Sequence, residues 1–266
     1  MALEPFIVLS GIISFQKNNQ HLQPRENTGH TALQILSEAD AFNNWMYSAI
    51  RPYASGNILE IGSGLGNISK FFILKGDTIT LSDIDTFYLD HLQKKFKDYP
   101  NVKNFLSIDL QTKEFSKNYE ELKEKFDTVF LLNVLEHLSD DSYAIQNCKF
   151  MLKEKGTLII LVPAYSFLFS EMDKQLNHFR RYTIKSVCKK IDAEGFHIEK
   201  SFYFNFMGIP AWLYGKLRKF KVLPKTEMKL YNKLVPFGKL LDKIIFHKAG
   251  LSAIAVARKI NPDSTN

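Results

Sequence analysis

The sequence predicts an α/β domain in which helices cover both faces of a mostly parallel sheet. Short apolar runs alternate with segments of helical periodicity from residue 57 to residue 204, which is the pattern of βαβ units. A glycine-rich turn, Gly62 to Gly66, separates the first apolar run from a helical segment. Of the 266 residues, 45% are hydrophobic and 24% are charged, so the chain can bury one large core and a small subdomain.

The residues before the sheet form a separate N-terminal part. Residues 1–15 are apolar but include Glu4 and lack a basic start and a small-residue cleavage site, so we expect neither a signal peptide nor a membrane span. Residues 16–31 are polar and predict a linker. The helical pattern at 33–50 predicts one amphipathic helix. We therefore assign residues 1–54 to an N-terminal segment with one helix.

Seven strands and the helices between them follow from periodicity and from glycine or proline stops. The strands are expected at 57–61, 78–81, 102–108, 126–132, 157–162, 196–204 and 251–257. The helices are expected at 68–75, 87–99, 118–125, 140–152 and 184–193. No long regular crossover joins the last two strands, so an antiparallel pairing at one edge fits them.

The two cysteines, Cys148 and Cys188, each lie within a predicted helix. We interpret them as small buried hydrophobic residues and not as a disulfide or metal site. This usage fits a reducing, cytoplasmic compartment.

Polar or glycine-rich groups follow four consecutive predicted strands. The glycine loop follows the first, Asp83 the second, Asp109 the third and residues 133–137 the fourth. Carboxyl ends of parallel strands meet at one edge of a sheet, where ligands bind. Asp83 lies 21 residues after Gly62, a position from which an acid accepts both hydroxyls of a ribose. One such acid alone is often only a cap or turn former; the run of four favours a nucleoside-type ligand.

The spacing of the glycines restricts the class of ligand that the loop can bind. The pattern Gly62-x-Gly64-x-Gly66 differs from the G-x-G-x-x-G of dinucleotide folds, and Glu60 would repel a pyrophosphate but could face an ammonium group. Both features disfavour a nicotinamide oxidoreductase. With Asp83, Asp109, Phe126-Asp127 and Asn133-Val134-Leu135-Glu136-His137, the series resembles the motifs of class I S-adenosylmethionine-dependent methyltransferases over roughly residues 55–165.

The resemblance implies a Rossmann-like, seven-stranded, mostly parallel sheet with an antiparallel last strand and a helical lid insertion. It implies S-adenosyl-L-methionine as cofactor and methyl transfer as activity. Residues 55–205 and 250–260 would form the methyltransferase domain. The helix at 33–51 would be a lid over the cofactor, and residues 206–249 would be a basic, aromatic insertion that covers the acceptor site.

The resemblance also implies roles for cofactor-binding residues. Glu60 would support the glycine loop against the amino-acid end of the cofactor, Asp83 would hold the ribose and Asp109 the adenine. Asn133 and Val134 would line the sulfonium end. The full expected set is Glu60, Gly62, Ser63, Gly64, Gly66, Asn67, Asp83, Ile84, Asp109, Leu110, Asn133 and Val134.

Two histidines compete for the role of general base. His137 stands beside Glu136 after the fourth strand, and His178 follows the fifth; either can instead be a capping or packing residue. Some methyltransferases place E-x-x-E-H after the fourth strand and bind a divalent metal. Here Asn133 occupies the first of those positions, so the sequence predicts no metal.

Residues 173–183 are denser in polar groups than a connecting loop requires. The segment resembles the D…H-x-R-R-Y-T segment of a bacterial subgroup of these enzymes. The other interpretation places its arginines in surface pairs and its tyrosine in the core. The candidates for acceptor binding are Trp45, Tyr165, Asp173, Arg181 and Tyr182.

Basic residues gather in residues 206–249, which hold ten Lys and Arg against two acids in a chain of net charge +7. This segment suits a lipidic or anionic acceptor, or peripheral docking on an anionic membrane; solvated amphipathic helices explain it equally well. We expect a cytoplasmic methyltransferase that acts at oxygen on a small-molecule or lipid-linked acceptor. An RNA methyltransferase and a non-catalytic S-adenosylmethionine-binding protein stay open as alternatives, although no RNA-binding motif is visible and nucleic acid is the less favoured partner.

Overall fold

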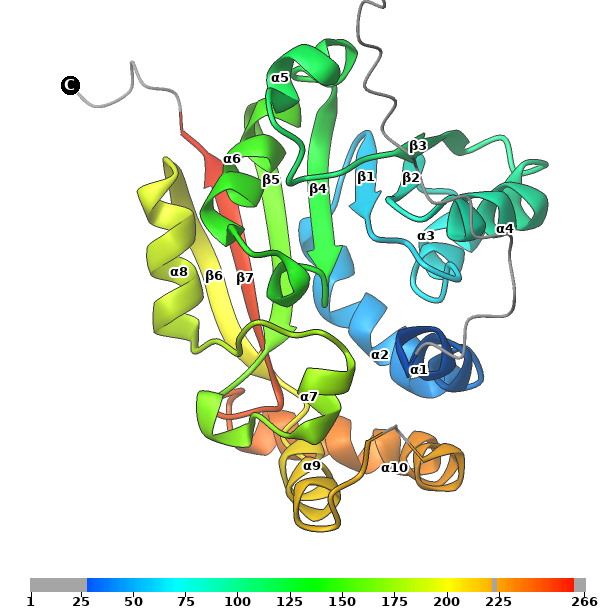
Figure 1. The fold of residues 1–266 in the computed structure, drawn as a ribbon, viewed down its shortest axis with the longest axis vertical. Coiled ribbons are helices and arrows are strands. Elements are labelled where there is room, and N and C mark those ends of the chain that lie inside the picture. The colour runs from blue at the N-terminus through cyan, green and yellow to red at the C-terminus, as the bar shows by residue number, and fades with distance from the viewer. Residues whose placement is uncertain (1–27, 222–223, 261–266) are drawn as a thin grey trace, which may run out of the picture.

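The computed structural model describes residues 28–221 and 224–260. The apolar start at 1–15 and most of the expected linker lie outside these ranges. Seven strands form one sheet in the order β3-β2-β1-β4-β5-β7-β6. Every strand pair is parallel except the two that β7 makes, with β5 and with β6 (Figure 1). The predicted fold class is thereby confirmed.

All seven predicted strands are present. Their bounds are β1 (Ile58–Ile61), β2 (Ile79–Asp83), β3 (Val102–Ser107), β4 (Phe126–Leu132), β5 (Leu152–Pro163), β6 (Phe196–Phe204) and β7 (Ser252–Lys259). β5 begins five residues before its predicted start, on the amino-terminal side of Gly156. β7 lies between β5 and β6, so the outermost strand on that side of the sheet is β6.

Helices cover both faces of the sheet. They are α1 (Thr28–Ser37), α2 (Asp40–Ile50), α3 (Ser69–Leu74), α4 (Thr86–Phe96), α5 (Phe115–Asn118), α6 (Asp141–Met151), α7 (Glu171–Gln175), α8 (Ile184–Ala193), α9 (Gly208–Leu217) and α10 (Lys225–Ile244), with the 3-10 turns η1 (Arg51–Tyr53), η2 (Glu120–Leu122), η3 (Leu135–His137) and η4 (Ser166–Leu168). No helix within the described ranges combines the length and the apolar character that a membrane crossing requires.

Two predicted helices differ from the structure. The expected single helix at 33–50 is two helices, broken between Ser37 and Asp40, and the side chain of Asn43 satisfies the Leu36 carbonyl at the break at 2.7 Å. The expected helix at 118–125 is wrong, because that stretch holds only the end of α5 and the turn η2. In both places local hydrogen bonds replace a helical turn that periodicity alone does not exclude.

The core has two layers, one on each face of the sheet. Neighbouring residues along a strand point to opposite faces, so Ile58 and Phe130 pack with α2, α3 and α4. Leu59 and Val129 pack with α5, α6 and α8 on the other face. The central strands are therefore buried on both sides, and ligands can reach them only at their ends.

The connection between β6 and β7 places α9 and α10 beyond the carboxyl ends of β4 and β5 (Figure 1). Buried Asp242, near the end of α10, accepts the backbone N–H groups of Asn205 and Phe206 at 2.7 and 2.8 Å. Nearer the start of α10, Asn232 accepts the N–H of Phe42 in α2 at 2.9 Å. These bonds hold α10 across the ligand-binding edge of the sheet.

Candidate functional site

A cavity of about 1870 Å³ lies at the carboxyl ends of the parallel strands. Its wall combines the glycine loop, the ends of β2 and β4, helices α1 and α2, and helices α9 and α10. Pockets for one drug-sized ligand measure roughly 300–1,000 Å³. This cavity therefore has room for a nucleoside-type cofactor and a second molecule.

The glycine loop requires glycine for two different reasons. Gly62, Gly64 and Gly66 have φ angles of 71°, 53° and 72°, a region that other residues rarely adopt. A Cβ on Gly62 would stand 2.6 Å from Val134 Cγ2, and one on Gly66 would stand 2.5 Å from the Phe96 ring. Gly62 thus lets the turn after β4 approach the loop beside the cavity, whereas Gly66 serves packing against α4 and does not line the cavity.

Asp83, at the end of β2, connects the loop with the cavity. One of its carboxylate oxygens accepts the N–H of Gly64 and the other accepts the N–H of Asp85, at 2.9 and 3.0 Å. Burial raises the pKa of Asp83, and these backbone bonds oppose the rise. Ser63, Asn67 and exposed Ile84 line the same part of the wall.

Glu60 precedes the last residue of β1 and is almost fully buried at the cavity wall, with 5% exposure. The hydroxyl of Ser69 donates a hydrogen bond to its carboxylate. Burial raises the pKa of Glu60 to about 7, against the hydrogen bonds from Ser69 and Ser63. The group is therefore close to the point at which a neighbouring positive charge decides its protonation.

Asp109 and Leu110 do not line the cavity. The Asp109 carboxylate accepts the N–H of Gln111 and the hydroxyl of Thr112, at 2.8 and 3.1 Å. The backbone carbonyl of buried Leu110 accepts a hydrogen bond from the Asn147 side-chain amide at 2.9 Å. Both residues shape the turn after β3, so the expected adenine contact stays a prediction.

Three of the acceptor candidates lie in packing contacts outside the cavity. The Trp45 ring packs against Phe204 with centroids 4.6 Å apart. Buried Tyr182 donates to Asp141 at 2.9 Å. The Tyr165 ring stacks on Phe167 and on Tyr203. These three side chains fill space in the core or in a loop. A sequence pattern does not distinguish this packing role from ligand binding.

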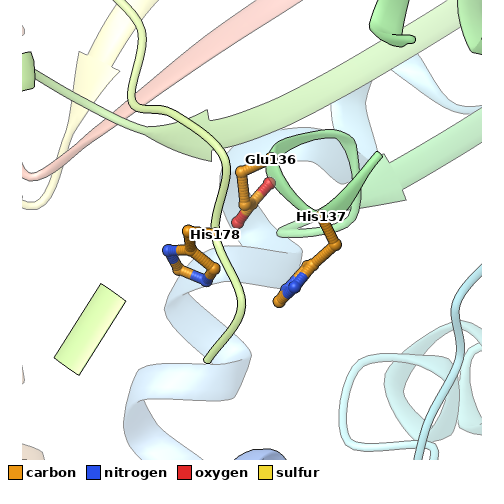
Figure 2. A group of neighbouring side chains, drawn as sticks. All are labelled: Glu136, His137 and His178. Carbon is orange, nitrogen blue, oxygen red and sulfur yellow. The ribbon is translucent and has the colours of Figure 1, made fainter. Parts of the chain in front are cut away.

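Three potential proton-accepting or metal-ligating side chains meet at the cavity wall beyond the end of β4. Glu136 and His137 lie in η3 after β4, and His178 lies in the loop after α7. Their donor atoms all lie within 4.8 Å of one another, and Figure 2 shows the Glu136 carboxylate pointing between the two imidazole rings. We call these three residues the Glu–His–His cluster. The turn into η3 begins at Asn133, which has a positive φ of 53° and lines the cavity with Val134.

Burial dominates the electrostatics of the cluster. It raises the pKa of Glu136 to about 8, against the attraction of its own backbone N–H and of Arg181. Desolvation of its ring and, second, the neighbouring His178 together lower the pKa of His137 to about 4, although part of the residue is exposed to solvent. Both Glu136 carboxylate oxygens are buried, and neither has a hydrogen-bond partner among the described residues.

Asp173 supports the cluster from behind. Its Oδ1 lies 2.9 Å from His178 Nδ1 and accepts Arg181 Nε at 2.8 Å. Arg181 also donates to the Ala164 carbonyl at 3.1 Å and stacks on the Trp212 ring, 4.4 Å from its centroid. His178 and Arg181 line the cavity whereas Asp173 does not. Asp173 thus acts through the two side chains that it holds.

Sequence patterns missed part of the cavity wall. The sequence assigns no role to Glu136, although it belongs to the motif after β4. Its lack of hydrogen-bond partners among the described residues depends on the whole fold and is visible only in the structure. Trp212 and Tyr231 come from α9 and α10 and His30 from α1, in segments that had only compositional signals.

Comparison with known proteins gives a consistent result. Residues 59–158 match the family model described as a methyltransferase domain. A ubiquinone biosynthesis O-methyltransferase of Actinobacillus pleuropneumoniae is 33% identical over 105 residues, which cover 38% of this chain and 43% of the relative. A highly reducing polyketide synthase of Aspergillus nomiae is 30% identical over 113 residues, which cover 39% of this chain and 4% of that protein. The chain thus spans less than half the length of these two relatives.

A solved structure, a SAM-dependent methyltransferase from Archaeoglobus fulgidus, is similar in fold. It has a TM-score of 0.53 and 14% identity, covering 82% of this chain and 94% of that one. The sheet order and the methyltransferase-domain match over residues 59–158 are consistent with a class I S-adenosylmethionine-dependent methyltransferase, as the sequence predicts. Its methyltransferase domain includes residues 59–158, and the cofactor of the class is S-adenosyl-L-methionine, as the sequence predicts.

Proposed function

We propose that the chain transfers a methyl group from S-adenosyl-L-methionine to an oxygen of a small-molecule or lipid-linked acceptor. The observation that carries this proposal is the single cavity that joins the glycine loop to the Glu–His–His cluster and to α9 and α10. The name of the Actinobacillus relative, an O-methyltransferase, supports oxygen as the methylated atom.

The cofactor half of the cavity suits S-adenosyl-L-methionine in charge and shape. Glu60 offers a carboxylate to an ammonium group, and Asp83 keeps lone pairs for ribose hydroxyls beyond its two backbone bonds. Gly62 and Gly64 bring backbone to the cavity wall beside both acids. We assign Asn133 and Val134, which lie between the loop and the cluster, to the sulfonium end.

The acceptor half supplies positioning and proton removal. When bound, the cofactor supplies a methyl group on a positively charged sulfur. The chain must hold the acceptor oxygen in line with that methyl group and exclude water. The new C–O bond forms as the C–S bond breaks and its electron pair stays on sulfur. The acceptor proton passes to a histidine of the Glu–His–His cluster, His137 or His178, and Asp173 orients the His178 ring.

The apolar character of the acceptor half favours a lipid-linked acceptor. Side chains from the 206–249 segment line it with little charge; they include Met207, Pro210, Trp212, Phe220, Met228 and Leu234. Such a wall binds an alkyl or prenyl group by removing apolar surface from water.

The outer surface of α10 extends this apolar wall to solvent. Five of its large apolar side chains are 44–60% exposed and recur at helical spacing on one face: Leu230, Leu234, Phe237, Leu240 and Ile244. Exposed Lys229, Lys233 and Lys243 belong to the same helix. Leu230 and Leu234 also line the cavity. We therefore propose that α10 rests on an anionic membrane surface, from which the acceptor enters the cavity.

Membrane contact is testable with one residue on this face. Phe237→Asp is expected to weaken binding to phosphatidylglycerol vesicles about tenfold, because it puts a charge where an exposed apolar side chain would enter the membrane. Vesicle sedimentation measures this, and phosphatidylcholine vesicles and high salt should each reduce binding. Leu74→Asp, at a 68% exposed position on α3, is the matched control and should bind as the unchanged protein does. Equal loss in both variants would contradict docking through α10.

Methyl transfer is testable without knowledge of the acceptor. Cell extract incubated with the protein and methyl-labelled S-adenosylmethionine should yield labelled product in the organic-solvent fraction. Label confined to RNA would favour the RNA methyltransferase alternative. Absence of label in every fraction, with the cofactor bound, would favour a non-catalytic protein.

The cofactor role of Asp83 predicts a loss of affinity. Asp83→Asn is expected to raise the Kd for S-adenosylhomocysteine roughly 10–100-fold, because hydrogen bonds to a charged carboxylate contribute roughly 1.5–3 kcal/mol. Isothermal titration calorimetry measures the change. Asp90→Asn, on the exposed side of α4, serves as control. An unchanged Kd for Asp83→Asn would remove Asp83 from the ribose site.

A further inference from the structure

We infer that the Glu–His–His cluster is a binding site for a divalent transition-metal cation such as Zn²⁺, with an open position for the acceptor oxygen. The inference deepens the proposed function and rests on it for the identity of that oxygen. The sequence predicts no metal, because Asn133 stands where a carboxylate would begin an E-x-x-E-H set. The structure instead brings a third donor, His178, from a loop that follows a different strand.

The donor set and its spacing fit such a cation. Two imidazoles and one carboxylate with an open position are a common ligand set of catalytic Zn²⁺. The donor atoms lie within 4.8 Å of one another, and the two ring centroids are 4.6 Å apart. Tetrahedral ligands at about 2.1 Å from Zn²⁺ lie about 3.4 Å from each other. Side-chain movements of roughly 1 Å therefore close the set around an ion.

The carboxylate of Glu136 points independently to a cation. Both its oxygens are buried with no hydrogen-bond partner among the described residues, and the residue has no exposed surface. A buried carboxylate without a partner is unfavourable. Arg181 attracts it, but its Nε and Nη1 donate to Asp173 and Ala164. A cation at the cluster would give both oxygens the partner that they lack.

The histidines are oriented as metal ligands usually are. His178 Nδ1 lies 2.9 Å from Asp173 Oδ1, so Nε2 is the nitrogen available to an ion. Metal-binding histidines commonly bond a carboxylate or a backbone carbonyl through their other nitrogen. Asp173 is itself fixed by Arg181 and by the backbone N–H of Ser170, at 2.8 Å each. His137 bonds to the Leu176 backbone carbonyl, which leaves its second nitrogen for the ion.

The open side of the cluster faces the cavity, because all three residues belong to its wall. A hydroxyl bound to the ion would lose its proton more readily. Its O–H bond breaks, the proton passes to solvent water, and the oxygen keeps the electron pair with which it attacks the methyl group. The cation would thereby replace a histidine base in the proposed reaction.

Metal binding by the purified full chain tests the inference directly. After removal of metal with a chelator, titration calorimetry with ZnCl₂ should give one ion per chain, and MgCl₂ should bind far more weakly because Mg²⁺ prefers oxygen ligands. Glu136→Gln and His178→Ala should each weaken Zn²⁺ binding at least about 100-fold. His197→Gln, at an exposed position on β6, should not weaken it.

Co²⁺ absorption provides a second measurement that is independent of activity. The unchanged protein should show visible bands of low-symmetry Co²⁺, and Glu136→Gln should lose them while its thermal unfolding without metal is retained. No stoichiometric Zn²⁺, or equal binding in Glu136→Gln, would overturn the inference. Assay of methylated product from labelled S-adenosylmethionine, run in parallel, separates the two proposals. Zinc binding without any methylated product would support the metal site and contradict the proposed function. Methylated product without zinc binding would contradict only the metal site.

Discussion

Asn in place of Asp173 is expected to lower the free energy of unfolding by about 3–5 kcal/mol and to reduce kcat about 100-fold. The stability loss arises because Arg181, whose side chain is 1% exposed, would remain buried without its partner carboxylate. The loss in kcat arises because His178 would lose the negative group that fixes its ring. Asp173 itself lies outside the cavity wall, so both effects are transmitted through side chains that it contacts.

Urea unfolding followed by tryptophan fluorescence measures the first effect, and turnover at a temperature where both proteins are folded measures the second. Glu171→Gln is the matched control, since it removes a carboxylate from the same helix, where Glu171 makes only surface contacts with Lys174 and Gln175. The His178 tautomer, read by ¹⁵N NMR, should change in Asp173→Asn and not in the control. A variant as stable and as active as the control would show that the Asp173 contacts are not important.

The placement of the glycine loop and Asp83 at one end of the cavity could be predicted because it depends on local sequence. Strand, glycine turn and helix are consecutive at residues 58–74, and Asp83 follows the next strand along the chain. Parallel strands bring such ends together whatever surrounds them. Asp109 obeys the same rule, yet its carboxylate caps its own turn. Sequence position therefore predicts that an acid lies at the end of a strand, but the local turn determines which groups its carboxylate hydrogen-bonds.

The part of the cavity around the Glu–His–His cluster could not be predicted to the same degree because it is assembled from distant segments. His178 joins His137 across 41 residues through the loop after α7. Trp45 is of a residue type that often contacts ligands, but its ring packs beside Phe204 and against Gly238. The burial of Glu136 and the course of α10 depend on the whole fold, and a periodic pattern contains neither.

Glu60→Gln is expected to stabilise the cofactor-free protein by roughly 3 kcal/mol at pH 8 and to leave it unchanged near pH 4.5. Burial raises the pKa of Glu60 from its ordinary 4.5 to about 7. Below pH 4.5 the carboxyl is protonated in both the folded and the unfolded chain. Between pH 4.5 and 7 this carboxyl releases its proton in the unfolded chain but keeps it in the folded chain. The free energy of unfolding therefore falls as the pH rises. Above pH 7 the whole penalty is present, and the amide of Gln does not incur it.

The same substitution should weaken S-adenosylhomocysteine binding about tenfold or more, because the ammonium group loses an ionised partner in a buried site. Denaturant unfolding from pH 4.5 to 8 tests the first effect and calorimetric titration the second, with exposed Glu121→Gln as control. A stability difference that does not change with pH would contradict the buried, protonated Glu60. Gain of stability together with loss of affinity would mean that the fold retains an unfavourable buried acid because the cofactor needs it.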